Sequence, residues 1–65
     1  MIKEFAAAAM RRIDEAAATR TAQVAKGSCK SLEDYKETCG QIRGLELARQ
    51  LIEDTLKNVE EDEDV

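Results

Sequence analysis

The residues of this chain that could take part in chemistry are two cysteines and a scattering of carboxylates. Cys29 and Cys39 are the only thiols, and the sequence contains no histidine. A thiol nucleophile needs a neighbouring base, and histidine is both the commonest general base and the commonest metal ligand. A structural zinc site needs four nitrogen or sulfur ligands. We therefore predict no catalytic residue, no metal site and no cofactor, and we predict that the chain is not an enzyme.

The cysteine spacing also argues against a disulfide. If a helix starts at Ser31, Cys39 lies roughly 12 Å beyond that start, at ~1.5 Å of rise per residue. A disulfide needs Cα atoms within about 7 Å of each other. We expect two free thiols in a reducing cytoplasm. The chain also lacks a secretory signal and any apolar run near the ~20 residues of a membrane span, so we expect no membrane partner.

Two glycines one helical turn apart are the most informative residues for binding. Gly40 and Gly44 lie inside a segment that otherwise favours a helix, where each glycine costs about 1 kcal/mol relative to alanine. Leu47 and Leu51 extend the same stripe. One interpretation is a partner interface, in which the glycines let a second helix approach closely. The alternatives are a close crossing with the first helix of the same chain, or a kink near Gly40.

Two helices must position these residues. Residues 2–26 contain nine of the ten alanines and no glycine or proline, which favours a helix that Gly27 ends. Ser31, followed by acidic residues, is typical of the start of a second helix over 32–59. The short connection predicts an all-α fold, an antiparallel two-helix hairpin over residues 1–59, with a disordered acidic tail over 60–65.

The hairpin by itself buries little apolar surface. A chain of 65 residues is marginal alone. In the second helix, two apolar stripes lie side by side over its C-terminal half, and the first helix covers only one of them. We therefore expect the core to be completed by a homo-oligomer or by docking on a larger assembly. The first-helix stripe predicted to face the second helix is Ile2, Phe5, Ala6, Ala9, Met10, Ile13, Ala16, Ala17 and Val24.

Charge is divided unevenly along the chain. Residues 1–30 carry six basic and three acidic side chains, whereas residues 31–65 carry four basic and eleven acidic ones. The acidic run at the end argues against a nucleic-acid partner, because phosphate attraction needs clustered lysine and arginine. Arg20, inside the apolar stripe, is expected to reach Glu37 or Asp34. The only basic strip that could hold nucleic acid contains Arg11, Arg12, Lys26 and Lys30.

Two resemblances bear on function. The layout is similar to that of the plasmid-encoded repressors of primer, helical hairpins that dimerise into a four-helix bundle and bind paired RNA loops. The segment 34–48 resembles a motif in small helical proteins of tailed bacteriophages, which are often encoded near head, portal or tail genes. The shared positions are Tyr35, Gly40, Ile42, Gly44, Leu45 and Ala48.

The phage resemblance implies a non-enzymatic structural or assembly protein of the virion. We expect it to dock through Gly40, Gly44, Leu47 and Leu51, either on itself or on a portal, neck or capsid assembly. Its place would be the host cytoplasm during expression, and then the virion. One alternative is a small dimeric regulator that binds RNA or DNA through the basic face of the first helix. Another is an inhibitor of a host protein whose acidic tail mimics nucleic acid.

Overall fold

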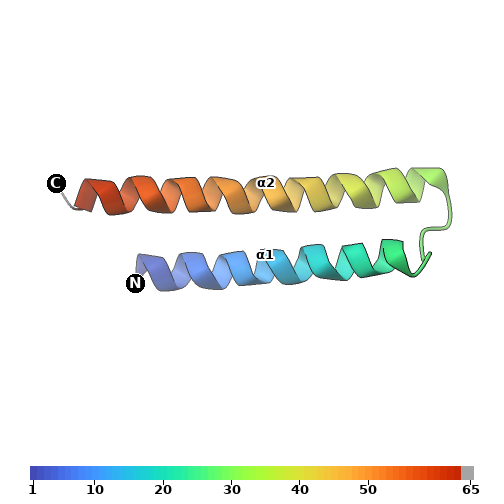
Figure 1. The fold of residues 1–65 in the computed structure, drawn as a ribbon, viewed down its shortest axis with the longest axis horizontal. Helices are drawn as coiled ribbons and strands as arrows, with labels where there is room; N and C mark the ends of the chain where they lie inside the picture. The colour runs from blue at the N-terminus through green and yellow to red at the C-terminus, as the bar shows by residue number, and fades with distance from the viewer. Residues whose placement is uncertain (64–65) are drawn as a thin grey trace.

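The described part of the chain forms two helices. The computed structural model describes the backbone of residues 1–63 and the side chains of residues 1–60. Helix α1 spans Ile2–Ala25 and helix α2 spans Leu32–Glu63, with no strand in the described part. The helices lie side by side and run in opposite directions, joined by a short connection at one end (Figure 1). This confirms the predicted all-α antiparallel hairpin.

The end of α1 is set by a glycine in the left-handed region. Gly27 has φ of +73°, a value that side chains with a Cβ rarely adopt. Its N–H donates to the Val24 carbonyl at 3.0 Å, and the Ser28 N–H donates to the Gln23 carbonyl at 3.0 Å. These two bonds form a Schellman motif, which satisfies carbonyl groups that the last helical turn would otherwise leave unpaired.

The start of α2 is set by a side-chain cap. The Asp34 N–H donates to the Ser31 hydroxyl at 3.1 Å, as expected for an N-cap serine. The Asp34 carboxylate in turn accepts a hydrogen bond from the Lys30 N–H at 3.2 Å. The predicted helix start at Ser31 is therefore confirmed.

The helix boundaries differ slightly from the predicted ones. Helix α1 ends at Ala25 rather than at residue 26, because Lys26 is its C-cap. Helix α2 passes through Gly40 and Gly44 without a break and continues to Glu63, four residues beyond the predicted end. The predicted tail over 60–65 is thus helical as far as residue 63, and residues 64–65 lie outside the described part of the chain.

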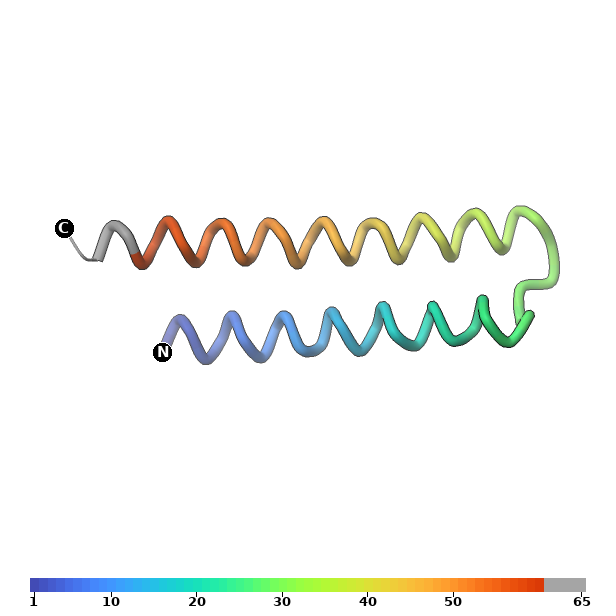
Figure 2. Tube along the Cα trace, in the orientation of Figure 1, coloured from blue at the N-terminus to red at the C-terminus, as the bar shows by residue number. Residues whose placement is uncertain are grey.

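The hairpin is elongated and thin (Figure 2). Its Cα atoms extend over 52 × 16 × 11 Å, and its radius of gyration is 15.3 Å. A globular chain of this length has a radius of gyration of about 11 Å. Among the described side chains Ala6 alone is buried, at 6% exposed. The two helices touch along their length but do not enclose a core.

Candidate protein–protein interface

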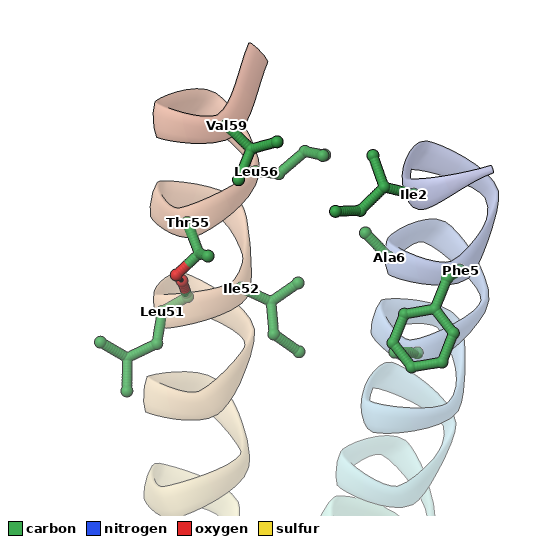
Figure 3. A pocket seen from close by; sticks show the side chains of 9 residues that line it. Ile2, Phe5, Ala6, Leu51, Ile52, Thr55, Leu56 and Val59 are labelled. Carbon is green, nitrogen blue, oxygen red and sulfur yellow. Dashed lines mark hydrogen bonds between the residues drawn. The ribbon is translucent and has the colours of Figure 1, made fainter. Parts of the chain in front are cut away.

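An apolar groove of about 290 Å³ lies between the helices at the open end of the hairpin (Figure 3). In α1, residues at three- and four-residue spacing contribute to it, because this spacing keeps them on one face. In α2, two turns and the start of a third contribute the opposite wall. The side chains that line the groove are Ile2, Phe5, Ala6, Ala9, Leu51, Ile52, Thr55, Leu56 and Val59.

The groove contains almost no polar group. Thr55 is its only polar side chain, and the Thr55 hydroxyl donates to the Leu51 carbonyl at 2.7 Å. Small-molecule sites normally add a few convergent polar groups to an apolar lining, because these groups orient the ligand. This groove offers none that is unpaired. Its chemistry therefore suits the apolar side chains of another protein.

Large apolar side chains project beside the groove. Phe5 is 75% exposed and Leu51 is 57% exposed. In Figure 3, Ile52 and Ile2 point into the space between the helices, whereas Leu51 points away from α1. Leu47 lies one turn before Leu51 and is also exposed. The prediction that Leu47 and Leu51 stay available to a partner therefore fits their positions, and they do not belong to the contact between α1 and α2.

The two helical glycines lie in open space. A Cβ built on Gly40 or on Gly44 meets no atom within 4 Å. The alternative of a close crossing with α1 is therefore wrong. The absence of a break in α2 removes the alternative of a kink near Gly40. Gly44 does lie near α1, in a shallow hollow that it shares with Arg20, Gln41 and Leu45. The hairpin thus gives no internal reason for either glycine.

Ion pairs lie on the flank of the hairpin opposite to Phe5 and Leu51. Arg49 of α2 donates to Asp14 of α1 at 2.8 Å and also pairs with Glu53, and Lys3 lies 3.6 Å from Glu60. The hydrogen bond and charge of Asp14, and then the charge of Glu53, raise the pKa of Arg49 above its ordinary value. The side chains of these pairs are partly exposed to water, so each pair contributes little to stability.

The apolar side chains and the ion pairs lie on different sides of the contact between the helices. One helical turn takes 3.6 residues, so Phe5 and Asp14 point to opposite flanks of α1, and Leu51 and Glu53 point to opposite flanks of α2. We call the side without ion pairs the apolar flank. It consists of Phe5, Ala9, Gly44, Leu51 and Thr55, with Gly40 and Leu47 at its outer edge. The exposed Arg12 lies on the same flank, two turns after Phe5 in α1.

The apolar flank is continued by polar residues toward the bend. The Arg20 Nε donates to the Gln41 side chain at 2.9 Å, and an Arg20 terminal nitrogen donates to the Ala16 carbonyl at 3.1 Å. The prediction that Arg20 reaches Glu37 or Asp34 is therefore wrong, because Gln41 is the residue of α2 that lies opposite it. A polar hollow follows, lined by Gln23, Ser28, Cys29, Asp34, Glu37, Thr38 and Gln41.

A second hollow, lined by apolar and basic side chains, lies near the bend on the other flank. Leu32 is 69% exposed, and Tyr35 and Cys39 line the same shallow hollow. A hydrogen bond with Cys39 raises the pKa of the Tyr35 phenol above its ordinary value. Both cysteines are free and half-buried. No group of three or more potential metal ligands occurs among the described residues.

The basic residues of the nucleic-acid alternative are not brought together. All four are exposed, and Arg11 and Arg12 lie about 22 Å along α1 from Lys26, at ~1.5 Å per residue. The acidic Glu15 lies one turn after Arg11 on the outer face of α1, whereas Arg12 lies on the flank that carries Phe5. In the described part of the chain, neither helix is long and apolar enough to cross a membrane.

The sequence pattern did not predict that Phe5 projects at the edge of the groove. The 3.6-residue pattern placed Phe5 in the stripe facing α2, yet among the described residues it is the most exposed large apolar side chain after Met1. The missed signal is its position at the edge of that stripe, where Ile2 and Ala6 occupy the centre. Phe5 and Leu51 together, from different helices, frame the groove that neither helix shows alone.

Comparison with known proteins supplies no relative. No protein-family model matches the chain, and no significant match to it occurs among the curated proteins or the solved structures.

Proposed function

We propose that this chain is a non-enzymatic assembly protein that acts by packing its apolar flank against another protein. The observation that carries the proposal is the mismatch between apolar surface and burial. Only Ala6 is buried among the described side chains, while Phe5, Leu47 and Leu51 project from one side of the hairpin. Contiguous exposed apolar surface of this kind marks interaction sites.

The make-up of the flank supports protein contact over chemistry. It contains neither a carboxylate nor a thiol, and Thr55 is hydrogen-bonded within its own helix. Its charged side chain is Arg12, whose long stem can pack against apolar groups while the guanidinium stays in water. Interfaces carry most of their binding energy in a few large side chains at the centre of a patch. Phe5 and Leu51 are suited to that role, and Gly44, two turns before Leu51, leaves open space on the same flank.

The resemblance of residues 34–48 to small phage proteins supports placing this role in a virion. In that setting the protein would be made in the host cytoplasm and would then join a head, portal or neck assembly. The shared glycines of that motif are the residues that leave α2 open on the apolar flank.

A site-specific photo-crosslinker tests the proposal. We would place benzoylphenylalanine at Leu51, and in a matched control at Ala18, which is exposed on the back of α1. After irradiation in the producing cells, we expect discrete protein adducts from position 51 and none from position 18. Equal yields from both positions, or no adduct from either, would contradict a role for the apolar flank.

A further inference from the structure

The solvent-accessible surface area of the chain indicates what covers the apolar flank. The hairpin exposes 5287 Å², whereas a compact monomer of 7.2 kDa exposes about 4,100 Å². The excess of about 1,200 Å² exceeds the ~800 Å² that each partner buries in a standard stable interface. One further hairpin packed along the flank would account for this excess. This inference rests on the proposed function and names the partner.

The polarity of the flank changes along its length. Phe5 and Leu51 lie at the open end, and Arg12 follows two turns after Phe5. Arg20, Gln41 and Glu37 lie toward the bend. A partner that matches this surface must be apolar at one end and polar at the other. A second hairpin meets this requirement only if its open end lies beside the open end of the first. In the opposite direction, Phe5 would cover the Arg20–Gln41 pair and bury polar groups without new partners.

The charge of the two helices points to the same arrangement. Helix α1 carries four basic and three acidic residues, and helix α2 carries four basic and ten acidic ones. Packing α2 against a second α2 would bring two acidic helices together. Packing α1 against a second α2 places opposite net charges side by side, which favours association.

We propose that the occupant is a second copy of this chain, related to the first by a twofold axis that runs along the helices. In this dimer the groove of one hairpin closes on the groove of the other. Helix α1 of each copy lies against α2 of its partner, and every neighbouring pair of helices is antiparallel. Such a contact uses the same surface on both copies, as a twofold interface requires.

This arrangement explains the presence of a glycine at position 44. The Arg20–Gln41 bond fixes which residues of α1 and α2 lie at the same height. At the height of Gly44, the flank of α1 carries Ala16, so the twofold axis brings Gly44 opposite Ala16 of the second copy. Two small residues in contact let the helices approach closely. The cost of glycine in α2 is then offset in the dimer.

The first test is the mass of the full chain in solution by light scattering over a wide range of concentration. We expect twice 7.2 kDa. Leu51→Ala should raise the dimer dissociation constant at least tenfold, and Lys57→Ala, on the other flank, should leave it unchanged. A monomer at all concentrations, another oligomer, or equal effects of the two variants would overturn the proposal.

The second test measures the direction of packing with a native thiol. Cys29 lies at the bend, and in a Cys39→Ala variant it is the single site for a spin label. The twofold axis proposed here predicts a distance between the two labels of under about 30 Å, at most about three helix diameters. Packing in the opposite direction would separate the two bends by about the length of the hairpin, 52 Å. A long distance would therefore exclude the arrangement.

A matched label at the open end removes dependence on one position. In a variant with Cys29→Ser, Cys39→Ala and Glu4→Cys, we again expect a short distance, because like ends lie together. The photo-crosslinking experiment separates this inference from the proposed function. If position 51 gives only adducts with a different protein, the second-copy inference fails while the assembly role stands. If position 51 gives none, both fail.

Discussion

Gly27 shows how a single backbone conformation ends a helix. Its φ of +73° costs an alanine about 1 kcal/mol or more, because the Cβ then approaches the following carbonyl. We predict that Gly27→Ala lowers the free energy of unfolding by about 1 kcal/mol, measured by urea unfolding followed by circular dichroism at fixed protein concentration. Gly27→Asn is the matched control and should lose less than half as much, since asparagine tolerates this region. Equal losses would contradict a conformational cause.

Ser31 fixes the other side of the bend. Its hydroxyl accepts the Asp34 N–H at 3.1 Å, which leaves one fewer unpaired donor at the start of α2. We predict that Ser31→Ala lowers the free energy of unfolding by about 1 kcal/mol, and that Ser31→Asp lowers it by only a few tenths, because aspartate is an equally good cap. If both variants unfold at the same urea concentration as the original chain, the cap contributes nothing.

At the level of the helix, α2 combines a continuous backbone with a face that its own hairpin does not use. Gly44 has open space around it, and a Cβ added there meets no atom within 4 Å in the hairpin. We predict that Gly44→Leu abolishes association, because the larger side chain blocks close approach of a second helix, while the helical content of the chain is retained. Sedimentation and circular dichroism on one sample measure both quantities. Ala18→Leu, on the back of α1, is the control; a Gly44→Leu variant that associates normally would contradict the interface.

The contact between α1 and α2 combines an apolar strip with ion pairs on one flank. Arg49 joins Asp14 and Glu53, but all three side chains are partly exposed to water. We predict that Arg49→Gln destabilises the hairpin less than Ile52→Ala does, because water screens exposed pairs whereas a lost apolar contact is not replaced. Thermal unfolding at low and high salt measures this. The Arg49→Gln effect should shrink at high salt, and the Ile52→Ala effect should not.

For the whole molecule, stability should depend on protein concentration. A chain whose core is completed by another copy is stabilised by mass action, whereas a self-sufficient hairpin is not. We predict that the melting temperature rises by about 5 °C for each tenfold increase in concentration, measured by circular dichroism. A constant melting temperature would mean that the thin contact around Ala6 holds the fold alone.

The charge of the whole chain bears on the nucleic-acid alternative. The four candidate basic residues lie in two separated pairs, Arg11 and Arg12 in α1 and Lys26 and Lys30 at and beyond its end. The rest of the chain carries more acidic than basic residues. A regulator of this kind would bind RNA or DNA with an affinity that falls steeply with salt and that Arg11→Ala and Arg12→Ala weaken. An inhibitor with a mimicking tail would lose inhibition, but not association, on deletion of residues 60–64.

The sequence determined the features that depend on neighbouring residues. Alanine content, the glycine at residue 27 and the serine at residue 31 indicated both helices and the bend, because helix propensity and capping act within a few residues. The exposed stripe of Gly40, Gly44, Leu47 and Leu51 also follows from helical periodicity. The extension of α2 beyond Val59 was not predicted from the sequence, because the run of acidic residues there favoured a solvated tail.

Tertiary structure decided what depends on the rotation of one helix against the other. That rotation places Gln41, rather than Glu37 or Asp34, opposite Arg20, and it turns Phe5 out to the edge of the groove beside Leu51. Periodicity gives each helix a face but does not say where the faces meet. The meeting line is set by the fit of side chains across two helices, which is a property of the pair and not of either sequence segment.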